Sequence, residues 1–135
     1  GFHVGYPQGR PGEAASRLLA RSNLVSRGRR DNSESVLAWA ETGRTRGLLG
    51  SLGGLSGGPV YDEAGNVRGV IVAESSRRGR IYTAAPEAVA EFIKATGADT
   101  LGQQPRDFST ETYGREADYA RRNLQVVKVA CSVEE

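Results

Sequence analysis

The residues most able to do chemistry lie together in positions 53–60, which read Gly-Gly-Leu-Ser-Gly-Gly-Pro-Val. A Ser between glycines on a tight loop can present its hydroxyl openly, because glycine backbones turn without steric penalty. The same freedom lets neighbouring backbone N–H groups converge on one point. Two such groups form an oxyanion hole, which stabilises an acyl-transfer transition state by roughly 3 kcal/mol per donor. Ser56 is therefore a candidate nucleophile, on a loop that Pro59 and Val60 would fix to a strand.

Other reactive side chains are few. The chain has one Cys, Cys131, and one His, His3. A single Cys excludes an internal disulfide and a cysteine-rich zinc site, and a single His leaves too few ligands for most metal centres. We interpret Cys131 as a small buried hydrophobic residue and His3 as an ordinary strand histidine. The sequence therefore predicts neither a metal nor a cofactor.

The composition is that of a globular chain of 135 residues, with 38% hydrophobic and 25% charged residues. This length suits one domain. The net charge is +2, from 18 basic and 16 acidic residues, which is too balanced to favour nucleic acid. No apolar run approaches the roughly 20 residues that cross a membrane. We therefore expect neither a nucleic-acid partner nor a membrane partner.

Short apolar runs recur about every 10 residues between turn signals, which is typical of an all-β sandwich or barrel. Gly65 in the turn at 62–66 can take the positive φ that a hairpin loop needs, and Asp62 is a turn residue. The six expected strands are Phe2–Tyr6, Ser16–Leu24, Ser35–Glu41, Pro59–Tyr61, Val67–Ala73 and Arg80–Ala84.

The hydrophobic period changes at Pro86, where the sequence predicts a helix that ends at Gly97. Its apolar face, which includes Val89, Phe92 and Ile93, could cover one end of the sheet. Residues 98–115 read as a polar linker, and residues 117–124 as a short helix. The alternation in residues 125–133 predicts a half-buried strand with Val127, Val129, Cys131 and Val133 on its apolar face.

The stretch around Ser56 resembles the Gly-x-Ser-Gly-Gly-Pro signature of trypsin-like serine proteases. The order of elements after it is similar too: Pro-Val-Tyr, a turn, the run from Val67, the run from Arg80 and the helix from Pro86. Upstream, Val-Gly-Tyr-Pro-x-Gly at 4–9 resembles the strand that opens the second barrel of that family. The resemblance covers residues 2–97 and is closest to bacterial members without disulfides. It implies a six-stranded Greek-key β-barrel, one of the two barrels of such a protease, with a terminal helix.

The resemblance also implies roles for individual residues. Ser56 is the nucleophile, and the N–H groups of Gly54 and Ser56 are the oxyanion donors. Gly50 takes the position at the base of the specificity pocket, and Arg80 lies on the strand forming its far wall. The residues whose backbone would pair with the substrate chain are Val72, Ala73 and Glu74. Because Gly50 carries no charge, substrate Lys or Arg side chains would have no partner there. An Arg80 guanidinium that points inward would favour acidic substrate side chains, and one that points to solvent leaves a small apolar pocket. We favour the second pose, because burying an unpaired guanidinium is costly.

The chain departs from the family in two respects. A Ser nucleophile needs a base, and the His and Asp of the family lie in a first barrel, upstream of the second. In addition, Leu55 stands where vertebrate-type members have an Asp that pairs with a newly freed N-terminus. We therefore expect residues 1–97 to be a second barrel, residues 98–135 to be an extra tail, and an N-terminal barrel to come from the same precursor or another chain.

These observations predict a serine endopeptidase fragment that acts on peptide or protein substrates and is inactive alone. The alternatives are a non-catalytic pseudo-protease that binds peptides in the same cleft and a structural half-domain whose tail mediates assembly. By analogy with bacterial relatives, we expect a periplasmic or secreted protein.

Overall fold

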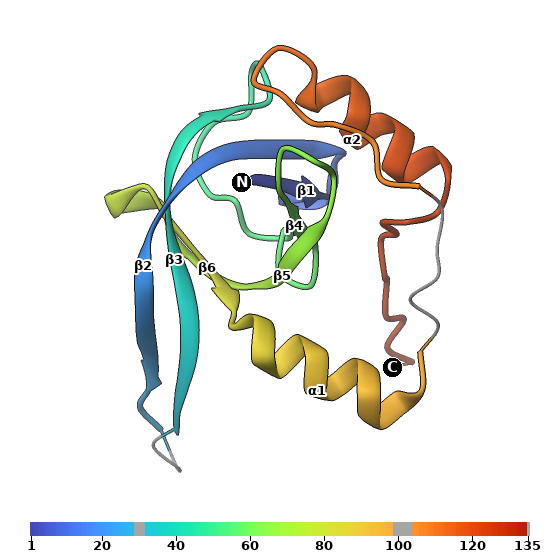
Figure 1. The fold of residues 1–135 in the computed structure, drawn as a ribbon. Coiled ribbons are helices and arrows are strands. Elements are labelled where there is room, and N and C mark those ends of the chain that lie inside the picture. Colours follow the sequence, from blue (N-terminus) through green and yellow to red (C-terminus); the bar gives the residue numbers. More distant parts are fainter. Residues whose placement is uncertain (29–31, 99–103, 135) are drawn as a thin grey trace.

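The computed structural model describes residues 1–28, 32–98 and 104–134, and shows a mostly β fold with two helices (Figure 1). Two short 3₁₀ turns, η1 (Pro7–Gly9) and η2 (Ser76–Arg78), interrupt the strands. The strands are β1 (Phe2–Gly5), β2 (Gly12–Ser26), β3 (Asn32–Arg44), β4 (Pro59–Tyr61), β5 (Val67–Ser75) and β6 (Arg80–Ala84). The helices are α1 (Pro86–Thr96) and α2 (Tyr113–Arg122).

The six strands form one antiparallel sheet in the order β1-β2-β3-β6-β5-β4. The sheet closes into a ring because β1 pairs with β2 on one side and with β4 on the other. Phe2 lies opposite Ala15 in the first ladder and opposite Tyr61 in the second. The six strands expected within residues 2–84 are all present, and the predominantly β character of the chain is confirmed.

Strands β2 and β3 are longer than predicted and extend beyond the ring as a two-stranded ribbon (Figure 1). Their ladder continues to Ser26 opposite Asn32, whereas β3 pairs with β6 only from Val36 to Ala40. The hydrophobic pattern marked only the apolar centre of each strand. The polar ends remain extended because their backbone groups pair with each other, whatever side chains they carry.

The interior of the ring holds a cluster of buried side chains from five strands and from the Ser56 loop. Leu52 and Leu55 each have 1% of their surface exposed and come from that loop. Burial of a Leu side chain contributes roughly 1.5–3 kcal/mol. Leu55 therefore anchors the Ser56 loop in the core, a role that its position in the motif did not suggest. The other members are Ala14, Trp39, Val60, Ile71 and Ile81.

A second buried cluster joins the sheet to the C-terminal segment. Phe108 stacks on Tyr61 with ring centroids 4.7 Å apart, and on Phe2 at 5.5 Å. Ala117 and Ala120 of α2 belong to the same cluster. The prediction of a polar linker over residues 98–115 is therefore wrong for Phe108, which is part of the core; residues 99–103 lie outside the described residues.

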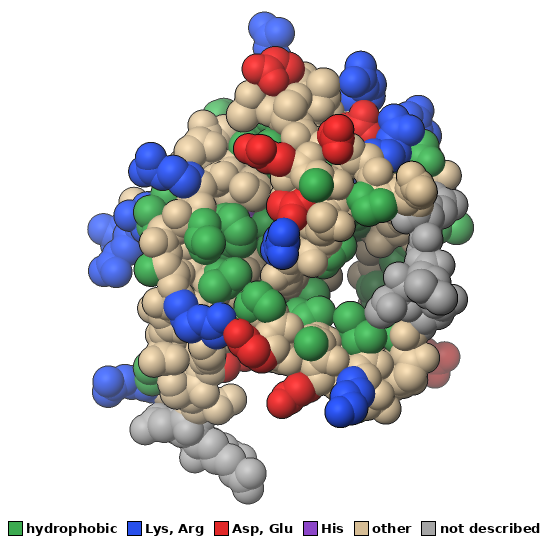
Figure 2. Space-filling model, in the orientation of Figure 1, with side chains coloured by type: hydrophobic (Ala, Val, Ile, Leu, Met, Phe, Trp, Pro, Cys, Tyr) green, Lys and Arg blue, Asp and Glu red, His purple; other side chains and the backbone are tan. Residues whose placement is uncertain are grey.

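Helix α1 has the predicted bounds, and Gly97 ends it with φ of 65°. Pro86 begins it, and the Arg21 guanidinium holds Glu87 of its first turn through two bonds of 2.8 Å. However, 68% of the Phe92 surface is exposed and no residue of α1 is buried. Figure 2 shows hydrophobic side chains around a hollow beside this helix. Val89 and Ile93 of the predicted apolar face are half-buried and α1 contacts β5, so this face covers the sheet in part and leaves Phe92 exposed.

The C-terminal segment differs most from its prediction. Helix α2 begins at Tyr113 instead of Ala117, and residues 125–133 do not form a strand. Leu124 takes a positive φ of 57°, which turns the chain directly after the helix. As a result Val126 is buried, while Val127, Val129 and Val133 are exposed. Cys131 is exposed too, so the prediction that it is buried is wrong. No described strand pairs with this segment, so its alternating pattern has no ladder to join.

None of the described helices is both long enough and apolar enough to cross a membrane.

Candidate functional site

The loop that carries Ser56 is held at both ends by backbone hydrogen bonds. The Gln8 N–H of η1 donates to the Gly53 carbonyl over 2.6 Å. On the other side, Gly57 N donates to Ile71 O and Ile71 N donates to Gly58 O, both over 2.8 Å. The loop is thus fixed between η1 and β5, and the Ser56 side chain is exposed between these anchors.

Two glycines of the loop are required by close backbone contacts. Gly54 has φ of 104°, and a Cβ there would lie 2.5 Å from the Tyr6 carbonyl oxygen. A Cβ on Gly58 would overlap the Val4 carbonyl oxygen. Residues with a side chain rarely adopt the φ of Gly54, and at both positions a Cβ would clash with backbone atoms. The glycine-rich sequence therefore follows from how closely the loop packs on β1 and η1.

The loop leaves two N–H groups available beside the Ser56 hydroxyl. Leu55 N donates to Leu52 O over 3.0 Å, and Gly58 N donates to Leu55 O over 2.9 Å. Within the described part of the chain, the N–H groups of Gly54 and Ser56 donate to no acceptor. These are the two donors that the family resemblance singled out. An exposed pair of free N–H groups can bind a carbonyl or carboxylate oxygen.

Ser56 and Gly54 line a hollow of about 430 Å³ whose opposite wall is the C-terminal segment 125–129. Lys128 in this wall donates from Nζ to the Gly9 carbonyl over 3.0 Å. The sequence-based prediction missed this wall because it assigned the segment to a strand. No local signal in residues 125–129 indicates that α2 brings them to Ser56.

His3 is a buried strand residue, as predicted, and not a partner of Ser56. Its Nε2 lies 2.6 Å from the Ser16 Oγ, and its ring meets Trp39 edge to face with centroids 5.5 Å apart. Its Nδ1 is buried without a partner among the described residues. Burial, with a smaller effect from the nearby N-terminal ammonium, lowers the pKa of His3 to about 3. The imidazole is therefore neutral, and because it is buried and its Nε2 contacts Ser16 and not Ser56, it does not serve as the base for Ser56.

The expected specificity pocket brings its predicted residues into one neighbourhood. The Gly50 carbonyl accepts a bond of 2.8 Å from Nη1 of Arg44. Next to it, Ser51 donates from Oγ to the Glu74 carboxylate over 3.1 Å, and Ser76 donates to the same carboxylate over 2.6 Å. The Ser51–Glu74 hydrogen bond thus connects β5 to the loop that carries Gly50.

Strand β5 has an open edge where the sequence placed substrate pairing. Its ladder with β4 ends at Val70 opposite Pro59. Beyond a register shift between Ile71 and Ala73, the described residues that pair with β5 all belong to β6. The free edge from Val72 to Ser75 begins beside Gly57, because Gly57 bonds to Ile71. Val72 and Ala73 could therefore pair with an extended peptide that reaches Ser56.

Arg80 lies opposite Ser75 in the ladder between β5 and β6. Its guanidinium donates to the carbonyls of Arg78 and Gly79 over 3.0 and 3.4 Å, at the exposed η2 turn. It forms no ion pair within the described residues. The guanidinium thus occupies the turn, and Glu74 takes its hydrogen bonds from hydroxyl groups instead.

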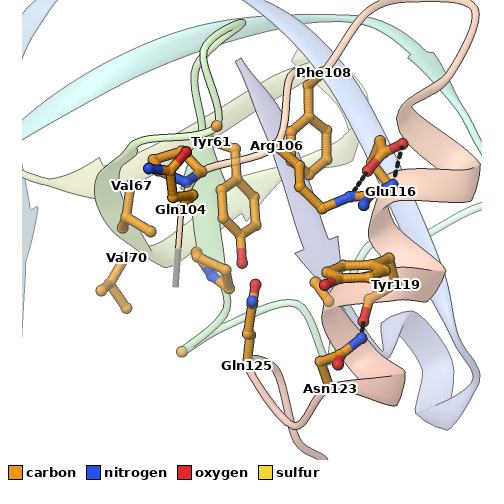
Figure 3. A pocket seen from close by; sticks show the side chains of 15 residues that line it. Tyr61, Val67, Val70, Gln104, Arg106, Phe108, Glu116, Tyr119, Asn123 and Gln125 are labelled. Atoms are coloured by element: carbon orange, nitrogen blue, oxygen red, sulfur yellow. Dashed lines mark hydrogen bonds and ion pairs between the residues drawn. The ribbon is translucent and has the colours of Figure 1, made fainter. Parts of the chain in front are cut away.

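A second cavity, of about 570 Å³, lies between the sheet and the C-terminal segment (Figure 3). Tyr61 and Gln125 extend into it, and Arg106 lies 4.0 Å above the ring of Tyr119. Arg106 bonds to Glu116 over 2.7 Å, which lowers the pKa of that carboxyl, while burial raises the pKa of the Tyr61 hydroxyl. The cavity borders the Ser56 hollow at Gly57, Pro59 and Gln125. No motif or pattern in the sequence indicated it.

Comparisons with protein-family models, with characterised proteins and with solved structures found no match to this chain.

Proposed function

We propose that this chain is the second Greek-key barrel of a trypsin-like serine endopeptidase, with Ser56 as its nucleophile. The observation that carries the proposal is the pair of free N–H groups, on Gly54 and Ser56, beside an exposed Ser hydroxyl on a loop fixed at both ends. The resemblance of residues 2–97 to this family supports the same interpretation.

The proposed reaction is amide hydrolysis through an acyl-enzyme. Ser56 Oγ attacks the carbonyl carbon of the scissile bond while a base takes the hydroxyl proton. The carbonyl oxygen becomes an oxyanion that accepts hydrogen bonds from Gly54 N and Ser56 N. The base then gives its proton to the leaving amine, and water releases the acyl group from Ser56 by the same steps.

The base and the acid that orients it would come from a first barrel. Ser56 has no hydrogen-bonded base among the described residues, and the imidazole of His3 is bound to Ser16. We infer that this chain alone has no peptidase activity, and that the assembled enzyme works in the periplasm or outside the cell.

The proposed substrate is an extended peptide paired with β5 at Val72, Ala73 and Glu74. Its side chain before the scissile bond would enter the space at Gly50. The Arg80 guanidinium is engaged at the η2 turn, and the Glu74 carboxylate is bound by two hydroxyl groups. Small apolar side chains therefore suit this space better than charged ones.

A peptide-library profile of the protein assembled with its first barrel tests this function. We expect cleavage after small apolar residues and complete loss of cleavage in Ser56→Ala. Strong cleavage after Lys or Arg would contradict the proposed pocket, and cleavage after Glu that Arg80→Ala abolishes would assign that pocket to acidic side chains. An assembled protein that binds peptides without cleaving them would be a pseudo-protease.

A further inference from the structure

The C-terminal segment is attached to the sheet by a buried ion pair. Arg121 of α2 and Glu13 of β2 each have 8% of their side chains exposed, and Nη2 of Arg121 lies 2.9 Å from the Glu13 carboxylate. Nη1 of the same guanidinium donates to the carbonyls of Gly5 and Gly12, both over 3.2 Å. The guanidinium also bonds to Asp118 of its own helix over 2.6 Å. Its contacts with the Glu13 carboxylate and two backbone carbonyls fix both the position and the rotation of α2.

This attachment determines where the residues after α2 lie. Val126 is buried in the cluster formed by Phe2, Phe108 and their neighbours, with 6% of its surface exposed. Two residues later, Lys128 reaches the Gly9 carbonyl. Residues 125–129 are thus held at three points, by Arg121, Val126 and Lys128, along the hollow that contains Ser56.

The charge of that hollow comes from one residue. Among the described residues that line it, Lys128 carries the one charged side chain, and the others are neutral. Its ammonium is in no ion pair within the described part of the chain, and one carbonyl uses one of its three N–H donors. The free N–H groups of Gly54 and Ser56 lie in the same hollow and also attract negative charge.

We propose that residues 125–129 form one wall of the peptide site and that Lys128 makes this wall a subsite for a carboxylate of the bound peptide. The carboxylate belongs to an acidic side chain or to a free C-terminus. This subsite is separate from the space at Gly50. It rests on the proposed function and deepens it by naming a substrate class.

The expected preference is modest because Lys128 is exposed. Solvent-exposed ion pairs contribute on the order of 0.2–1 kcal/mol, which corresponds to a preference of about 1.4- to 5-fold. Such a preference is screened by salt, so it should shrink toward 1 as the ionic strength rises to about 1 M.

Peptide binding to the 135-residue chain tests the subsite without any catalysis. The probes are acetyl-Ala-Glu-Ala-amide against its Gln counterpart, and acetyl-Ala-Ala-Ala as free acid against its amide. Binding is followed by the NMR shifts of the Gly54, Ser56 and Lys128 amide groups. We expect one or both carboxylate peptides to bind about 1.4- to 5-fold more tightly than their neutral counterparts, and the pair that differs identifies the source of the carboxylate.

Variants of Lys128 decide whether this residue is responsible. Lys128→Gln should remove the preference and Lys128→Glu should reverse it, while Lys94→Gln on α1, the other Lys of the chain, should leave it intact. Equal binding of charged and neutral peptides, or a preference that survives Lys128→Gln, would overturn the proposal. Because binding needs no base, a carboxylate preference in this chain, combined with an unreactive Ser56 in the protein assembled with its first barrel, would refute the protease function and leave the subsite standing.

Discussion

The burial of His3 predicts that the chain loses stability as the pH falls from 7 to 5. The imidazole has no exposed surface, and its pKa is lowered from 6.5 to about 3. Between these two values the unfolded chain binds a proton that the folded chain does not. The free energy of unfolding therefore falls as the pH falls through this window, and the contribution of His3 is fully present above pH 6.5.

The size of the effect follows from the two pKa values. Each pKa unit corresponds to 1.36 kcal/mol, so lowering the pH from 7 to 5 removes about 2 kcal/mol. Paired carboxylates such as Asp62 and Glu87 have lowered pKa values. Their contribution to the stability of the fold is lost mainly below about pH 5. The interval from pH 7 to pH 5 therefore reports chiefly on His3.

Urea denaturation at the two pH values measures this difference, with the fluorescence of Trp39 as the signal, since Trp39 is the one Trp of the chain and is buried. In His3→Gln the pH-dependent part should shrink toward zero. Comparison of this variant with the native sequence also removes the contribution of the Gly1 ammonium, whose pKa is lowered by burial. Equal stability of the native sequence at pH 7 and pH 5, or an imidazole NMR titration near pH 6.5, would refute the burial of His3.

Two further predictions concern packing. Arg121→Met leaves Glu13 buried without its partner and should lower the free energy of unfolding, measured by urea denaturation, by about 3–5 kcal/mol. Adding Glu13→Gln to this variant should recover part of that loss. Simple addition of the two destabilising effects would contradict the buried pair. Gly58→Ala should destabilise the chain by about 1–3 kcal/mol, because the new Cβ overlaps the Val4 carbonyl. Gly53→Ala should destabilise it less, because a Cβ there meets only the Ser51 hydroxyl, at 3.1 Å. Similar losses of stability for the two variants would show that the loop packs less closely on β1.

Local signals in the sequence were sufficient for much of the fold. The hairpin at 62–66 forms with Asp62 accepting hydrogen bonds from Ala64 and Asn66, and with Gly65 at φ of 81°. Helix α1 begins at Pro86 and ends at Gly97 as its end signals indicated. Each of these features depends on residues within a few positions of one another, so the sequence alone could reveal them.

The C-terminal segment could not be predicted in the same way. Alternating valines indicate a strand only where a neighbouring strand offers a ladder, and no described strand pairs with residues 125–133. Their position is set by Arg121 bonding to Glu13, which lies 108 residues earlier in the chain. The wall beside Ser56 depends on this long-range contact, so it was absent from the sequence-based site.

The labelling of Ser56 by a fluorophosphonate probe tests the central claim most directly. In the protein assembled with its first barrel, we predict one phosphonyl adduct on the peptide that contains Ser56, detected by mass spectrometry, and no adduct in Ser56→Ala. The isolated 135-residue chain, which lacks the base, should react far more slowly. An adduct that persists in Ser56→Ala, or an assembled protein that never reacts, would contradict the assignment of Ser56 as the nucleophile of a serine protease.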